Sequence, residues 1–128
     1  MKNIHRDYIN ISLIFAFTVF LIVMYFIGYL IKFNNPSDKD LLSRKCFIFI
    51  EDYWALTHIM LFFIVTYIYP NRYIFIMLCG LLWEIIEYIS GYIIKKLNYD
   101  KWWYGRAEDI LYNAIGVILA LLTKSILK

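Results

Sequence analysis

The stretch Gly80-Leu81-Leu82-Trp83-Glu84-Ile85-Ile86-Glu87-Tyr88-Ile89-Ser90-Gly91 places two carboxylates inside a run that is otherwise apolar enough to span a bilayer. A helical spacing of i, i+4, i+7 and i+11 puts four residues on one stripe: Gly80, Glu84, Glu87 and Gly91. The two glycines allow a neighbouring helix to approach the stripe closely. Because an ionisable side chain at bilayer depth is costly, it is normally paired, protonated or hydrated. The stretch therefore predicts a membrane-spanning helix with a functional polar face.

The composition of the whole chain supports an integral membrane protein. The chain has 128 residues, which favours a single domain. Hydrophobic residues make up 62% and aromatic residues 20% of the chain, more apolar surface than a soluble domain of this size can bury. The net charge is only +3, and the basic residues are scattered over the loops and termini. This distribution argues against nucleic acid as a partner.

We predict an all-α fold, an integral membrane bundle of four transmembrane helices in a single membrane domain covering residues 1–128. The spans are expected at about residues 11–31, 53–69, 73–94 and 107–122. Between the first two spans, residues 38–50 mix basic and apolar side chains, which is typical of an interfacial helix or of an early extension of the second span. The tight turn Pro70-Asn71-Arg72 makes the second and third spans antiparallel neighbours.

The polar side chains of the last three spans fall at similar depths. With a rise of about 1.5 Å per residue, His58, Glu84 and Asn113 lie roughly 8, 15 and 9 Å below the side of the two long loops. The same layer holds the other members of the predicted cluster: Glu87, Arg106 and Asp109. Asp109 and Asn113 share a helix face, because they are spaced i, i+4. We expect this face to pack against the Glu84/Glu87 stripe with His58 opposite, and Arg106 to pair with one of the acids.

The pattern of these residues resembles the VanZ-like family of small multi-pass membrane proteins. The resemblance covers roughly residues 52–122 and has three parts: His58, the motif Glu84-Ile85-Ile86-Glu87, and Arg106 followed by Asp109-Ile110-Leu111-Tyr112-Asn113-Ala114-Ile115-Gly116. Members of the family usually have Glu-x-x-Gln where this chain has Glu84 and Glu87. The resemblance implies the multi-pass architecture and the clustering of these polar residues. It supports these two features more than it supports any particular reaction.

The first functional hypothesis is an intramembrane protein that acts on or binds a lipid or a lipid-linked head group, because the cluster lies at a depth that head groups reach. Whether it is an enzyme is left open. The candidate catalytic residues are His58, Glu84, Glu87 and Asp109, and the candidate substrate-binding residues are Arg106 and Asn113. Glu84 would be the general acid and His58 the base. Arg106 would hold a phosphate, and Asn113 would orient a partner.

Three other interpretations stay open. No cofactor is predicted outright, but His58, Glu84, Glu87 and Asp109 are suitable ligands for a divalent metal ion. Alternatively, the chain is a non-enzymatic membrane adaptor or structural protein whose polar cluster locks helix packing, and whose small residues serve contacts in a homo-oligomer. Ion transport is less favoured, because the far half of the spans has no ionisable group. Basic residues are slightly more numerous in the long loops, which weakly favours a cytoplasmic location for those loops and leaves the orientation open.

Overall fold

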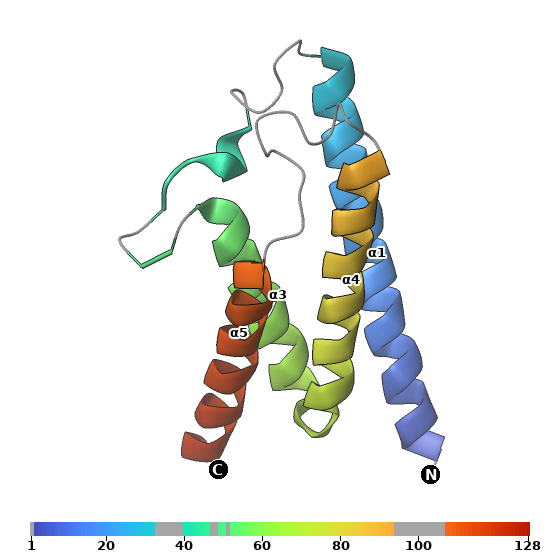
Figure 1. Ribbon diagram of the computed structural model, residues 1–128. Helices are drawn as coiled ribbons and strands as arrows, with labels where there is room; N and C mark the ends of the chain where they lie inside the picture. The colour runs from blue at the N-terminus through green and yellow to red at the C-terminus, as the bar shows by residue number, and fades with distance from the viewer. Residues whose placement is uncertain (1, 33–39, 47–48, 51, 94–106) are drawn as a thin grey trace.

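The computed structural model describes residues 2–32, 40–46, 49–50, 52–93 and 107–128. In these ranges the chain is all-helical, with four α-helices that run alternately up and down (Figure 1). They are α1 (Lys2–Lys32), α3 (Tyr53–Ile68), α4 (Tyr73–Ile93) and α5 (Ala107–Ile126). The short η2 turn (Pro70–Arg72) joins α3 to α4 at the end of the bundle where both chain termini also lie.

Three of the four α-helices, α1, α4 and α5, are long and apolar enough to cross a membrane. Helix α3 is equally apolar but has only 16 residues, a rise of about 24 Å. The exterior of the bundle is rich in large apolar side chains, such as Leu82, Ile86 and Ile118. The side chains buried inside include the polar groups of Glu84, Asp109 and Asn113. This distribution is that of a membrane protein, whose outer surface faces hydrocarbon.

The boundaries of three segments differ from the prediction, and one of these is α5, which continues to Ile126 instead of ending near residue 122. Helix α1 begins at Lys2, well before residue 11, because a helix continues past the apolar core of a span into the polar end of the segment. The predicted interfacial helix over residues 38–50 is wrong in its described part. Only Leu41–Ser43 forms a short 3-10 turn, η1, and residues 44–46 and 49–50 are not helical. The carboxylate of Asp40 caps η1 by accepting from the amide of Leu42.

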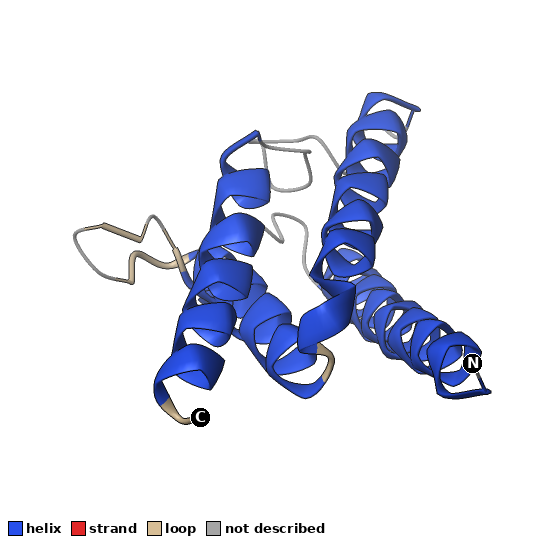
Figure 2. Ribbon diagram, turned by 90° about the horizontal axis from the view of Figure 1, so that it is seen from below, coloured by secondary structure: helices blue, strands red, loops and turns tan. Residues whose placement is uncertain are grey.

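Helices α3 and α5 form the closest pair in the bundle and lie side by side in both views (Figures 1 and 2). Gly116 makes this approach possible, because a Cβ atom there would meet the backbone oxygen of Ile59 and, at 3.0 Å, the Cβ of Phe62. Gly80 plays the same part on α4, where a Cβ would lie 2.5 Å from the Phe62 ring and 2.9 Å from Asn113 Nδ2. Small residues thus bring three helices together around Phe62.

Helix α1 stands beside α4 and is held by polar contacts at both of its ends (Figure 1). Near its start, Asp7 forms an ion pair with Arg72 of η2, with 3.5 Å between Oδ2 and Nε. Toward its other end, the hydroxyl of Tyr25 donates to Asp40 Oδ1 over 2.6 Å. Between these contacts the apolar side chains Ile11 and Phe15 pack into the core.

Candidate functional site

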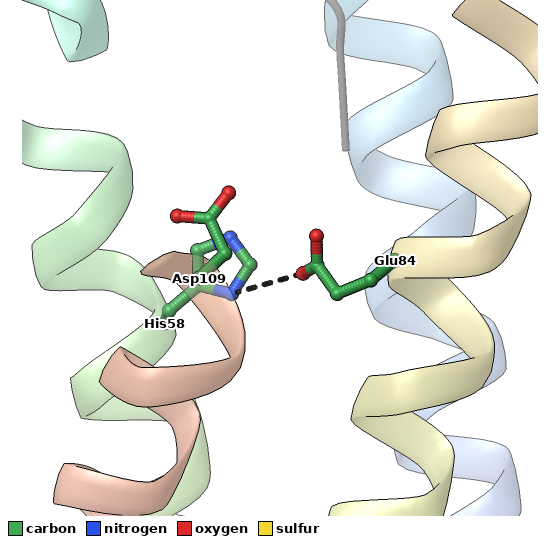
Figure 3. A group of neighbouring side chains, drawn as sticks. All are labelled: His58, Glu84 and Asp109. Atoms are coloured by element: carbon green, nitrogen blue, oxygen red, sulfur yellow. Dashed lines mark ion pairs between the residues drawn. The ribbon is translucent and has the colours of Figure 1, made fainter. Parts of the chain in front are cut away.

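Four polar side chains from three helices form the candidate site, which we call the polar cluster: the half-buried His58 from α3, and the buried Glu84 from α4 and Asp109 and Asn113 from α5. His58, Glu84 and Asp109 each offer one metal-ligating atom, and these atoms lie within 4.8 Å of one another. Figure 3 shows Glu84 reaching from α4 across to the imidazole of His58, with Asp109 beside the ring. The cluster is nearly closed to the exterior, since the side chain of His58 is 13% exposed and that of Glu84 only 5%.

His58 is the centre of the cluster, because its Nδ1 atom faces two oxygens. It lies 2.8 Å from Asn113 Oδ1, and in the tautomer that carries the proton on Nδ1 the ring donates this hydrogen bond. Nδ1 also lies 3.8 Å from Glu84 Oε1. The ring therefore links α5 and α4 from its position on α3.

The starts of α3 and α5 position these side chains. Helix α3 is capped by Asp52, whose Oδ1 accepts from the amide of Ala55 over 2.8 Å, and His58 follows less than two turns later. Asp109 lies in the first turn of α5, where the positive end of the helix dipole favours a carboxylate. Asn113 comes one turn further along the same face and is 1% exposed.

Two carboxylates at this separation interact strongly. At an effective dielectric of about 20, two negative charges about 5 Å apart repel by roughly 3 kcal/mol, and burial weakens the screening. A positive charge placed among Glu84, Asp109 and His58 is stabilised by the same interaction. The cluster is therefore suited to hold a proton, a cationic group or a metal ion.

The structure brings together the predicted residues His58, Glu84, Asp109 and Asn113, and it places Glu87 one turn away. Glu87 is half-buried and lines a neighbouring cavity. Arg106 lies outside the described residues. The Asp109/Asn113 face packs chiefly on α3, with His58 between this face and the glutamate stripe, because Gly116 and Ala120 allow α3 to approach more closely than α4.

A cavity of about 300 Å³ adjoins the polar cluster, and His58 belongs to both. Its walls are mostly apolar and come from α1, η1, α3 and α4; they include Phe15, Val19, Ile22, Leu61 and Trp83. Its polar lining includes Glu87 and the hydroxyls of Thr18 and Thr57. These hydroxyls donate to backbone carbonyls of their own helices, Thr18 to Ile14 and Thr57 to Trp54. The cavity reaches the surface of the bundle, since Leu21 and Thr57 in its lining are exposed.

One buried carboxylate was missed by the sequence analysis. Asp40, 3% exposed, accepts hydrogen bonds from Tyr25 Oη, from Ser43 Oγ at 2.9 Å and from Trp54 Nε1 at 2.7 Å. We call this group the Asp40 latch; it ties α1 and α3 together through η1. Tyr25 and Trp54 also line the cavity, so the latch fixes part of its wall. The available signal was Trp54, whose indole N–H requires an acceptor when it is buried.

No protein-family model, no curated protein and no solved structure matches this chain.

Proposed function

We propose that this chain is a multi-pass integral membrane protein that binds, or acts on, a lipid or a lipid-linked head group. The observation that carries the proposal is the cavity beside His58, whose mostly apolar walls also include the polar side chains of His58 and Glu87. An amphiphile requires this combination, since its chain is stabilised by apolar contact and its head group by hydrogen bonds. The resemblance to the VanZ-like family supports the same architecture and remains part of the proposal.

The chain of the ligand would occupy the space between α1, α3 and α4. Ligand pockets generally begin at about 300 Å³, so the cavity is large enough for part of an acyl or isoprenoid chain. Phe15, Val19 and Leu61 contribute walls of the kind that such a chain contacts. The head group would then meet His58 and Glu87 and, through His58, the remainder of the polar cluster.

If the protein is an enzyme, Glu84 and His58 are the proposed general acid and base, because they lie within 3.8 Å of one another and are both largely buried. Asn113 would orient the imidazole through its 2.8 Å hydrogen bond. Asp109 would stabilise positive charge that forms on the ring. Arg106 remains the proposed phosphate ligand on the sequence pattern alone.

The test compares lipids that co-purify with matched variants in detergent. Val19→Phe narrows the cavity, whereas Leu13→Phe adds the same ring on the exposed face of α1, where Leu13 is 62% exposed. Glu84→Gln removes a carboxylate charge from the polar cluster. Its control, Glu108→Gln, removes a carboxylate charge from the exposed position that precedes Asp109 in the chain. We expect Val19→Phe to lower the amount of bound lipid, because the added ring fills space that the chain of the lipid would occupy. We expect Glu84→Gln to lower it by about tenfold or more, because it removes the charge that faces His58, the ring that the head group would contact, and an interaction with a charged group contributes roughly 1.5–3 kcal/mol.

The second candidate is an adaptor or structural protein in which the polar cluster only locks the helices. It is favoured by the His58–Asn113 hydrogen bond between α3 and α5 and by the close approach at Gly116. In that case Glu84→Gln lowers the thermal midpoint or changes the oligomeric state, while Val19→Phe leaves the bound lipids as they are in the wild-type protein. Equal lipid content in all four variants and the wild type would rule out the lipid site.

A further inference from the structure

We propose that His58, Glu84 and Asp109 bind a divalent transition-metal ion, with Asn113 Oδ1 as a fourth ligand. This inference goes beyond the proposed function, because it concerns an ion held by the chain's own side chains and requires no lipid. The three residues come from α3, α4 and α5, so the ion would join three helices at one point (Figure 3).

The distances between the ligand atoms lie on either side of the spacing in a tetrahedral metal site. Ligand atoms about 2.1 Å from a tetrahedral ion are roughly 3.4 Å apart. Nδ1 of His58 and Oε1 of Glu84 are 3.8 Å apart, and the three ligand atoms all lie within 4.8 Å of one another. Rotation of the Glu84 and Asp109 side chains toward His58, with a shift of Asn113 Oδ1 away from its position 2.8 Å from Nδ1, would bring the four ligand atoms to this spacing.

Asn113 places an amide oxygen beside the same ring nitrogen of His58. Its Oδ1 lies 2.8 Å from His58 Nδ1, the ring nitrogen that also faces Glu84. An ion that replaces the proton on Nδ1 would therefore meet an amide oxygen as well as the carboxylate. Asn113 is 1% exposed and is packed against Gly80, so its amide cannot turn away into solvent.

The ligand set restricts the kind of ion. One imidazole and two carboxylates favour Zn²⁺, Fe²⁺ or Mn²⁺, since an imidazole is a poor ligand for Mg²⁺ and Ca²⁺, and soft ions prefer sulfur. Zn²⁺ is the strongest binder of these three in the general affinity order, so it is the probe of choice. The cavity, which reaches His58 from the surface, provides an entry path.

The first experiment measures Zn²⁺ binding to the tag-free full-length protein in detergent, by calorimetry and by elemental analysis after dialysis. We expect one zinc ion per chain in the wild type and in Glu108→Gln, which alters an exposed carboxylate next to Asp109. Asp109→Asn and Glu84→Gln should weaken binding by more than about 100-fold, because even residues that merely support a ligand cost about 10- to 100-fold. Retained helical circular dichroism verifies that these variants fold.

The second experiment needs no variant. X-ray absorption at the zinc edge of the wild-type protein should show nitrogen and oxygen neighbours with the scattering signature of an imidazole. Sulfur neighbours would assign the zinc to Cys46 or Cys79 and overturn the proposal, as would equal binding in the wild type and Asp109→Asn, or no binding at all. Val19→Phe separates the two proposals, since it should lose bound lipid but retain zinc.

Discussion

At the scale of single residues, the convergence of the polar side chains could be predicted from spacing. Rise per residue is nearly constant in a helix, so His58, Glu84 and Asn113 could be assigned to one layer before the structure was known. Which atoms would touch could not be predicted, because this depends on the rotation of each helix about its axis. Asp40 was missed for a related reason: its donors are brought to it by tertiary packing.

The Asp40 latch yields a prediction at this scale. Asp40→Asn replaces an acceptor-only carboxylate by an amide with one acceptor atom, so Tyr25 or Trp54 loses its partner. We expect a loss of about 1–3 kcal/mol in stability, seen as a lower thermal midpoint in detergent. Ser43→Ala, which removes one donor at an exposed position, should have a smaller effect. An unchanged midpoint in Asp40→Asn would show that the latch contributes nothing.

At the scale of elements, the four α-helices could be predicted from their apolar content, and the turn at Pro70 from its residue types. The partner of each helix could not. Pairing depends on where two surfaces allow close approach, and this was visible only as the small residues Gly80, Gly116 and Ala120. The interfacial helix failed because the donors around Asp40 stabilise a short turn at Leu41–Ser43.

The glycines form a graded series of variants. Gly116→Ala forces a Cβ against the backbone of Ile59, which cannot move alone, so we expect a loss of about 1–3 kcal/mol. Gly80→Ala should cost less, because its nearest neighbour is the end of the Phe62 side chain. Gly28→Ala is the control, since no atom outside the adjoining turns of its own helix lies within 4 Å of the added carbon, and alanine favours a helix. Thermal midpoints in this order test the packing; equal losses at all three positions would contradict it.

At the scale of the whole molecule, the class of protein could be predicted from composition alone, while the cavity could not. Its walls come from α1, η1, α3 and α4, and its volume depends on how α1 is held away from α3. The polar contacts that help to hold α1, to Arg72 at one end and to Asp40 at the other, involve loops and turns, whose positions a hydropathy pattern does not determine.

The shared location of the chain ends has an experimental consequence. Reporters fused to the two ends of the chain should both report the same compartment, since α1 begins and α5 ends at the same end of the bundle (Figure 1). From the slight excess of basic residues at the opposite end of the bundle, we predict that both reporters lie outside the cytoplasm of a bacterial host. Alkaline phosphatase should then be active, and green fluorescent protein dark, at both ends of the chain. If one end reads as cytoplasmic and the other does not, one of the four helices does not traverse the bilayer.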